Sequence, residues 1–277
     1  MLTSTFCHLP GVSARSERFL WDSGIRTWDE LLRHAAPPLS AGRLRTAHEQ
    51  LPLAQSNLAK GDPRWFIDRL SSKEHWRLFP EFRNGIAYLD IETTGLDRDH
   101  DAITTIALYD GRRIRTYVQG ENLEAFAGDI REYSLLVTYN GKCFDLPFIE
   151  NAMNIHLPQA HIDLRYVLHN LGYRGGLKGC ERQLGLGRGD LDGVDGFFAV
   201  LLWRDYRRSG CRAALETLLA YNIEDVVNLE ALMVMAYNLK LKETPFLDSH
   251  RLPPPKRPDI PFNVDLETVR RLRSRCF

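Results

Sequence analysis

Residues 86–95 read Ile86-Ala87-Tyr88-Leu89-Asp90-Ile91-Glu92-Thr93-Thr94-Gly95, an apolar run that ends in two acids and a turn. Side chains alternate between the two faces of a strand, so Asp90 and Glu92 share one face. A buried carboxylate costs several kcal/mol unless it is paired or binds a metal. An isolated Asp-x-Glu is more often a strand end in solvent. Together with the acids found downstream, however, this run predicts a buried strand that presents two acids to a cation.

The composition is that of an ordinary globular protein. With 277 residues, 44% of them hydrophobic, the chain is long enough for one full domain and a smaller appendage. No apolar run approaches the roughly 18 residues of a membrane span, and the N-terminus lacks the pattern of a signal peptide. We therefore expect a cytoplasmic protein with no membrane partner. Five cysteines without a C-x-x-C pair favour free thiols over a zinc site or a disulfide framework.

The charge is balanced overall but unevenly distributed. Formal net charge is +3 for residues 1–83, −6 for 84–240 and +3 for 241–277. An acidic centre between basic flanks fits a metal-dependent site whose polyanionic substrate is held partly by the flanks.

Residues 1–80 are predicted to form a small all-helical module. Ser13 and Thr27 each precede a helical pattern and are good N-caps. The order Leu-Pro-Gly-Val at 9–12, helix, Gly-Ile, capped helix resembles a helix-hairpin-helix element, which binds nucleic acid through backbone N–H groups. A purely structural helical bundle is the alternative. Two more helices are predicted at 40–60 and 63–72, followed by a connector at 75–80.

Residues 84–241 alternate between strand and helix patterns, which predicts an α/β domain. The first expected strand lies within 86–95 and is closed by Thr93-Thr94-Gly95. Further strands are expected at 102–109, 113–118, 135–139 and, at the edge, 161–164, and helices at 123–131, 144–151, 165–171, 177–184, 197–207 and 212–241. Asp110-Gly111 predicts a hairpin turn that makes the first three strands antiparallel. The glycine-rich stretch 185–196 is expected to be a mobile surface loop. A proline-rich linker and a basic helix at 264–275 occupy residues 242–277.

Two further acids lie where helices present them. Asp145 follows a buried strand and falls in the first turn of a helix, where a lone aspartate is more often a cap. Tyr221 and Asp225 are four residues apart on the last long helix, so they share a face. Leu218, Val226 and Leu229 make this region core-facing, and a buried aspartate there needs a partner.

Taken together, these motifs resemble a known family. Asp90-x-Glu92 ends the first strand, Asp145 lies in Asn-x-x-x-Phe-Asp, and Tyr221-x-x-x-Asp225 lies in a late helix. The pattern resembles the DEDD exonuclease superfamily in its tyrosine-bearing DEDDy branch, and is most similar to the YprB-type RNase H-like domain. Residues 177–186 and 221–229 add to that similarity. The resemblance covers residues 86–240 and leaves 1–80 and 241–277 outside.

The resemblance implies an RNase H-like fold, a mixed sheet flanked by helices, with a two-metal site. Asp90, Glu92 and Asp225 would hold one ion. Asp90 and, through water, Asp145 would hold the other. Oxygen ligands with retained waters favour Mg²⁺ or Mn²⁺ over zinc. Tyr221 stands where a histidine-bearing branch would have its histidine. A phenol is a poor base at neutral pH, so Tyr221 is assigned to orienting the attacking water.

Other polar residues near these motifs have weaker assignments. Thr93, Asn140 and Lys178 are candidates for substrate contacts. Glu224 lies one residue off the Tyr221–Asp225 face and is expected to be solvated. The loop 97–101 is interpreted as a polar turn, and Asp163 is expected to be a helix cap.

The function that the resemblance implies is metal-dependent 3′–5′ exonucleolytic hydrolysis of single-stranded DNA ends, which releases 5′-monophosphates. Two alternatives remain open. One is a 3′–5′ exoribonuclease with the same site, because no residue can be assigned to a 2′-hydroxyl contact. The other is a nucleic-acid-binding scaffold with a vestigial site, although a binder would not need buried acids.

Overall fold

A five-stranded mixed sheet lies at the centre of the computed structural model, which describes residues 1–191 and 194–274. The strand order is β3-β2-β1-β4-β5, so β1 is central. β1, β2 and β3 are antiparallel, whereas β4 and β5 run parallel to β1. The strands are β1 (Ile86–Thr93), β2 (Ile103–Tyr109), β3 (Ile114–Val118), β4 (Leu135–Thr138) and β5 (Ala160–Asp163). The predicted mixed sheet is confirmed, including the edge position of β5.

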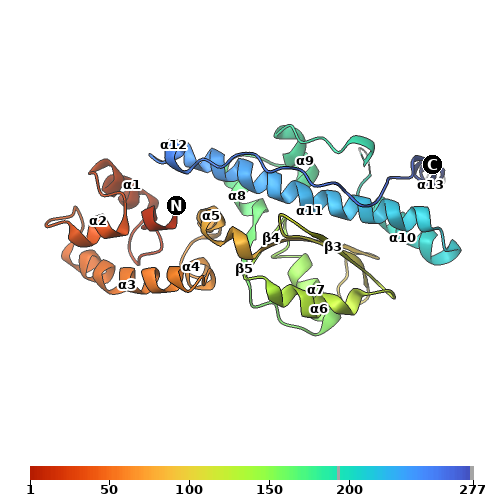
Figure 1. Cartoon of the computed structure of the whole chain (residues 1–277), viewed down its shortest axis with the longest axis horizontal. Helices are drawn as coiled ribbons and strands as arrows, with labels where there is room; N and C mark the ends of the chain where they lie inside the picture. The colour runs from red at the N-terminus through yellow and green to blue at the C-terminus, as the bar shows by residue number, and fades with distance from the viewer. Residues whose placement is uncertain (192–193, 275–277) are drawn as a thin grey trace.

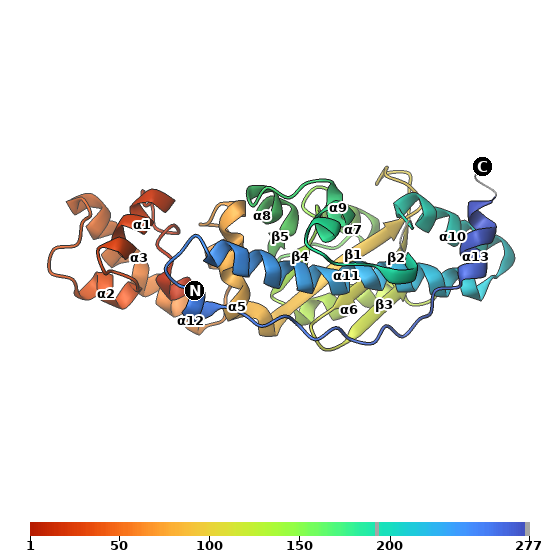
Figure 2. The ribbon, with the colours of Figure 1, turned by 90° about the horizontal axis from the view of Figure 1, so that it is seen from above.

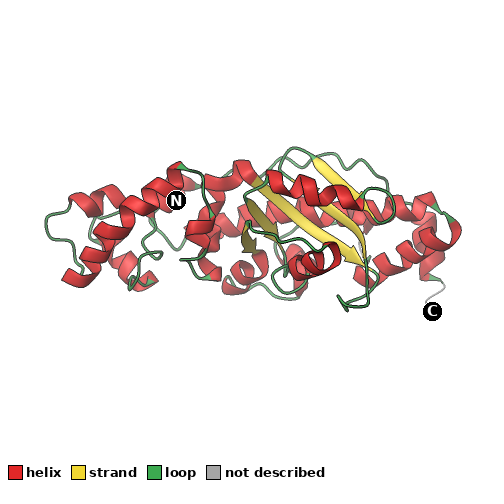
Figure 3. Ribbon diagram, turned by 90° about the horizontal axis from the view of Figure 1, so that it is seen from below, coloured by secondary structure: helices red, strands yellow, loops and turns green. Residues whose placement is uncertain are grey.

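Helices cover both faces of the sheet (Figures 1 and 3). Leu89 and Ile91 of β1 belong to a core cluster with Phe148 of α7 (Asp145–Met153) and Phe126 of α6 (Phe126–Asp129). The opposite face of the sheet lies under α11 (Arg212–Leu241), which contacts all of β1 to β4. The alternation along β1 therefore turns both Asp90 and Glu92 toward α11, and their shared face is the one that the sequence predicts.

The helix α11 is the longest element, with 30 residues, and most of its circumference is buried. At 1.5 Å per residue it extends about 45 Å. It runs from α10 (Gly196–Ser209) along the sheet to the N-terminal helices (Figure 1). α8 (Leu164–Asn170) and α9 (Gly176–Gln183) lie beside it. None of the described helices combines the length and apolarity that crossing a bilayer would require.

The N-terminal helical module is present and its caps are those predicted. Ser13 caps α1 (Ala14–Asp22), accepting from the Ser16 N–H, and Thr27 forms a capping box with Glu30 at α2 (Trp28–Arg33). The module also contains η1 (Leu2–Ser4), α3 (Ala41–Ala59) and α4 (Arg64–Ile67).

The core of the module is continuous with that of the sheet. One cluster of buried residues runs from Trp28 and Phe66 through Trp76 to Tyr237 of α11. The rings of Trp76 and Tyr237 lie 5.6 Å apart, at an edge-on angle. The module therefore packs against the end of α11 through buried aromatic side chains.

The C-terminal residues return along α11. After α12 (Leu247–His250), an extended segment of residues 251–265 runs beside α11 to α13 (Leu266–Arg273), which packs near α10 (Figure 2). Arg271 of α13 donates two hydrogen bonds to Asp205 of α10, at 2.9 and 2.6 Å. The predicted proline-rich linker is thus extended but lies against the domain.

The structure differs from four local predictions. The helix expected at 63–72 ends at Ile67, and the expected connector at 75–80 is instead helical: η2 (Ser72–Leu78) and α5 (Phe79–Phe82), followed by η3 (Arg83–Gly85). The helix expected at 123–131 is divided into η4 (Leu123–Ala125), α6 and η5 (Ile130–Glu132). The stretch 185–196 lies at the surface as expected, but it contains η6 (Gly189–Leu191), and the buried side chains of Arg188, Leu191 and Val194 hold its described part against the domain; residues 192–193 lie outside the described residues.

We predict that Arg77→Ala destabilises the fold by about 3–5 kcal/mol, because it removes one partner of a buried ion pair. Arg77 donates to Glu17 and Glu74, each at 2.8 Å, and both Arg77 and Glu17 are buried. Urea unfolding measures the change. The matched control is Arg15→Ala on the exposed side of α1. A loss for Arg77→Ala no larger than that of the control would contradict this prediction.

Candidate active site

Three carboxylates from β1 and α11 meet on the α11 side of the sheet. One oxygen from each of Asp90, Glu92 and Asp225 can be chosen so that all three lie within 4.8 Å of one another. Asp90 and Glu92 come from alternate positions of β1, and regular pairing with β2 shifts directly after Glu92. Asp225 comes from the turn of α11 that crosses the strand end. Asp225 thus joins two acids that lie 135 and 133 positions before it in the sequence (225 − 90 and 225 − 92).

Asp145 lies beside this cluster. Asp145 is the first residue of α7, and its Oδ1 accepts a hydrogen bond from the Ile91 N–H at 3.2 Å. Because Ile91 stands between the two acids of β1, this bond holds Asp145 against the strand end that carries them. The structure therefore brings all four predicted acids to one place, with Asp145 attached through the backbone of β1.

The acids are difficult to ionise together. Burial, followed by the charges of Asp225 and Asp145, raises the pKa of Asp90 well above its usual range. Burial and Asp225 do the same to the pKa of Glu92. Burial raises the pKa of Asp145 to about 7, against the hydrogen bonds that favour its anion. Crowded anions of this kind need a cation between them.

Asn222 holds Asp90 in place, a role that the sequence analysis did not assign. Its Nδ2 donates to Asp90 Oδ2 at 2.7 Å and to the Asp90 carbonyl at 3.3 Å. Its Oδ1 accepts from the Thr105 hydroxyl at 3.0 Å. This neutral amide fixes one carboxylate oxygen of Asp90 without neutralising it, which leaves the charge available for a ligand.

Tyr221 lies next to the cluster with 3% of its surface exposed. Burial and the charges of Asp225 and Glu92 raise the pKa of its phenol above the ordinary value. The phenol therefore stays protonated and can only donate or accept a hydrogen bond as O–H. This supports the predicted orienting role rather than that of a base.

Arg188 and Glu181 form a second group that the sequence analysis missed. Arg188 Nε and Nη2 donate to the two oxygens of Glu181 at 2.6 and 2.7 Å, and Nη2 also donates to Asp225. Both side chains are buried. Glu181 lies in the 177–186 segment quoted above, but nothing in its spacing signals a partner in the glycine-rich stretch. Burial and the charge of Glu181 raise the pKa of Asp225, and Arg188 between the two carboxylates offsets their repulsion.

The three candidate substrate residues have different surroundings. Lys178 Nζ lies 4.5 Å from the centre of the Tyr221 ring and donates to the Val194 carbonyl, so it belongs to the site. The Thr93 hydroxyl donates to the Gly95 carbonyl at the end of β1. Asn140, at φ +68°, accepts from Arg165 and makes no hydrogen bond to the four acids within the described residues.

The remaining polar residues behave as follows. Glu224 is 2% exposed and paired with Arg257, so the prediction that it is solvated is wrong. The loop at 97–101 is held by its own hydrogen bonds, such as that from His100 to Asp97 at 2.9 Å, as expected of a polar turn. Asp163 accepts from the Arg165 N–H at 3.0 Å and caps α8, as predicted.

An open groove begins two residues beyond Glu92. It has a volume of about 740 Å³ and extends from Thr94 over α10 to Leu272 of α13. Its lining includes three exposed arginines of α10, namely Arg204, Arg207 and Arg208. A basic groove that opens beside an acidic centre suits a polyanion whose backbone must approach the acids.

A family model of the RNase H superfamily matches residues 87–237, which is more than half of the chain and includes all four acids and Tyr221. No curated protein matches. Similar solved structures include a family B DNA polymerase from the archaeon Pyrobaculum calidifontis, with 17% identity and a TM-score of 0.45 over 57% of this chain and 24% of that chain. NrnC of Brucella melitensis with bound Mg²⁺ is also similar, with 19% identity and a TM-score of 0.40 over 60% of this chain and 77% of that chain. The same protein bound to pGG gives 18% identity and a TM-score of 0.40, over 61% and 79%.

We predict that the chain in chelator loses stability as the pH rises from about 7 to 8.5, because the folded state binds protons that the unfolded state releases. The folded pKa values of Asp90 and Glu92 are raised well above their ordinary 3.8 and 4.5, so both acids keep protons that the unfolded chain has released, and their contribution to stability is lost as the pH rises through the folded values. Most of the contribution of Asp145 is already lost between its ordinary 3.8 and its folded value of about 7. His8 and His161, with pKa values lowered to about 3, act in the opposite sense, but mainly below their ordinary 6.5.

Thermal unfolding at several pH values, with chelator and with Mn²⁺, measures this effect. The stabilisation by Mn²⁺ should grow over the same range, since a metal binds the deprotonated acids. Glu92→Gln, which removes one of the acids with a strongly raised pKa, should flatten the chelator profile. A chelator profile that rises between pH 7 and 8.5 would show that the cluster is not protonated in the folded chain.

Proposed function

The chain belongs to the RNase H superfamily, and from that premise we propose that it is a DEDDy-type 3′–5′ exonuclease acting on single-stranded DNA ends. The observation that carries the proposal is the cluster of Asp90, Glu92 and Asp225, whose oxygens lie within 4.8 Å. Burial raises the pKa of all three acids, and the charge of Asp225 raises those of Asp90 and Glu92 further, so full ionisation of the cluster favours a bound cation.

The donor set fits a pair of hard divalent ions, Mg²⁺ or Mn²⁺. All the candidate ligands are carboxylate oxygens, with no cysteine or histidine among them, and such ligands suit these ions rather than zinc. Asp90, Glu92 and Asp225 would hold one ion, and Asp90 with Asp145 the other. Two such ions, when bound, supply charge that stabilises the entering and leaving oxygens of a displacement at phosphorus.

The proposed reaction is hydrolysis of the terminal phosphodiester. Water attacks phosphorus, a new P–O bond forms, and the P–O3′ bond breaks. The 3′ oxygen takes up a proton, and the released nucleotide keeps a 5′-phosphate. Tyr221, which stays protonated, donates its hydrogen bond to the water and so sets the direction of attack. Lys178, beside the Tyr221 ring, offers a cation to the phosphate.

The arginine-lined groove supports a nucleic-acid substrate. Arg204, Arg207 and Arg208 lie on one side of it, and Thr94 brings its near end to the strand that carries the acids. A strand laid in this groove would have its phosphates near the arginines and its end near the cluster.

We predict that Asp90→Ala abolishes hydrolysis and retains binding of single-stranded DNA. Loss of a residue that only supports a metal ligand typically costs up to about 100-fold. Asp90 would itself be a ligand of both ions, so its removal should lower the rate by more than that. The assay is digestion of 3′- and 5′-labelled single- and double-stranded DNA and RNA, with Mn²⁺ and with chelator.

The control for this assay is Asp99→Ala, in the exposed loop after β1, which should digest normally. Loss of label from the 3′ end of single-stranded DNA supports the proposal. Preference for RNA would identify an exoribonuclease with the same site. Binding without hydrolysis by the wild-type chain in either metal would identify a scaffold and refute the enzyme.

We predict that Tyr221→Phe lowers kcat by about 10- to 100-fold. This is less than the roughly 100- to 10,000-fold contributed by a general acid or base, because only the orientation of the water is lost. Affinity for Mn²⁺, measured by calorimetry, should not change, since the phenol is not a ligand. Tyr173→Phe, outside the site, is the control. A drop in Mn²⁺ affinity for Tyr221→Phe would give the phenol a role in the metal site instead.

A further inference from the structure

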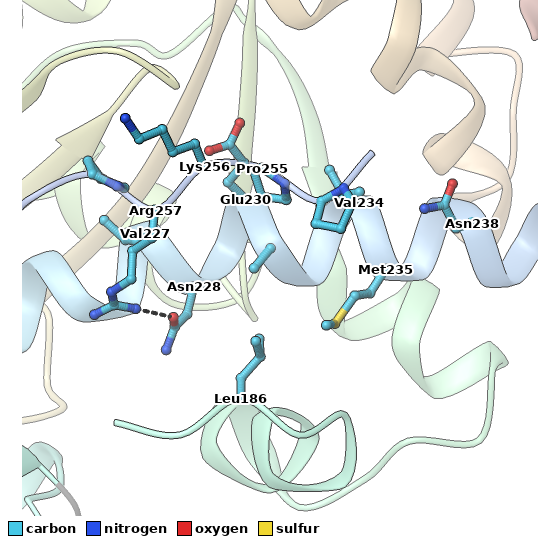
Figure 4. A pocket seen from close by; sticks show the side chains of 13 residues that line it. Leu186, Val227, Asn228, Glu230, Val234, Met235, Asn238, Pro255, Lys256 and Arg257 are labelled. Carbon is cyan, nitrogen blue, oxygen red and sulfur yellow. Dashed lines mark hydrogen bonds between the residues drawn. The ribbon is translucent and has the colours of Figure 1, made fainter. Parts of the chain in front are cut away.

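The extended C-terminal segment lies outside the matched family region, yet it contacts the helix that carries Asp225. Residues 254–258 line one side of a cavity of about 240 Å³, and Val227, Val234 and Met235 of α11 line the other (Figure 4). Packing along this seam is therefore incomplete. Polar contacts of Arg257 hold the segment against α11 at the end of the cavity nearest Asp225.

Arg257 has two partners on α11. Its Nη1 donates to Asn228 Oδ1 at 3.3 Å (Figure 4), and its Nη2 donates to Glu224. Glu224 is almost fully buried, and its other oxygen has no hydrogen-bond partner among the described residues. The planar guanidinium thus joins two side chains one helical turn apart.

Asn228 passes this contact inward. Its Nδ2 donates to Glu181 Oε1 at 2.9 Å, while its Oδ1 receives the bond from Arg257. An amide has a donor end and an acceptor end, so Arg257 selects the orientation in which the donor end faces Glu181. The reverse orientation would place the amide oxygen against the buried Glu181 carboxylate.

Glu181 in turn aligns the arginine that bonds Asp225. Arg188 makes a bidentate pair with Glu181 at 2.6 and 2.7 Å, and the Nη2 of that pair also donates to Asp225. A bidentate pair fixes the plane of the guanidinium. The orientation of Glu181 therefore decides which way Arg188 holds the Asp225 carboxylate.

We infer that Arg257 is a positioning residue for Asp225, acting through Asn228, Glu181 and Arg188. This inference rests on the proposed function, in which Asp225 is a metal ligand. The C-terminal segment, which lies outside the matched family region, thereby takes part in the metal site. Arg257 touches neither the acids of β1 nor the place of the substrate, so its effect should appear in metal binding.

The test is the affinity of the full chain for Mn²⁺, measured by calorimetry without nucleic acid. Arg257→Ala should weaken Mn²⁺ binding by about 5- to 10-fold, somewhat less than the 10- to 100-fold typical of direct outer-shell partners. Lys256→Ala removes a like charge from the neighbouring position of the same segment and should bind as the wild type does. Equal affinities for Arg257→Ala and Lys256→Ala would overturn the inference.

A double-mutant cycle with Asn228→Ala tests the route. If Arg257 acts through Asn228, the double variant should bind Mn²⁺ about as weakly as Asn228→Ala alone. Additive losses would overturn the route. If Arg257→Ala melts at a lower temperature than the wild type in chelator, the Mn²⁺ affinity of Arg257→Lys is compared with that of Lys256→Ala instead. Arg257→Lys keeps a cation for Glu224 but loses the planar fork that also reaches Asn228, so it should bind Mn²⁺ more weakly than Lys256→Ala. Asp225→Ala, measured in parallel, reports on the proposed metal site separately: its loss of Mn²⁺ binding would preserve that site even if Arg257 proved neutral.

Discussion

Mutual repulsion among buried carboxylates is the constraint on which the centre of this protein depends. Asp90 and Glu92 leave β1 on the face that α11 covers, and Asp225 comes down from α11 to meet them. In a medium of low dielectric constant such anions repel strongly, so in the absence of a cation they take up protons, as their raised pKa values indicate. A fold that keeps them together must restrain each one separately.

The restraints differ from acid to acid. Asn222 holds Asp90 with a neutral amide, and the backbone of Ile91 holds Asp145. Among the residues that the structure describes, Asp225 is the one acid of the four that bonds to a cationic side chain, Arg188, and Arg188 also pairs with Glu181. One positive charge shared between two carboxylates cannot neutralise the other acids, so the whole cluster ionises only when positive charge is added. The protein thus orders its acids while leaving room for added positive charge, which is the property that a divalent-metal site requires.

The sequence predicted correctly which side chains share a face wherever the repeat of a single strand or helix decides it. The two-residue period of β1 placed Asp90 and Glu92 on one face, and the spacing of four placed Tyr221 beside Asp225. It failed where a partner comes from a distant segment. Glu224 looked solvated because its helix position does not reveal that the C-terminal segment returns to cover it. Arg188 looked exposed because glycine-rich neighbours suggest a loop, whereas its burial follows from Glu181 and Asp225.

The amino-acid sequence by itself determined the strands, the long final helix and the shared face of Asp90 and Glu92, because these follow from local periodicity. The mixed sheet and the choice of the four acids rested on the resemblance to a known family. The tertiary structure alone decided how those acids are held. Hydrogen bonds from Asn222 to Asp90 and from Arg188 to Asp225 join residues 132 and 37 positions apart. No local pattern encodes such pairs, since each depends on the packing of α9, α11 and the C-terminal segment around one strand end.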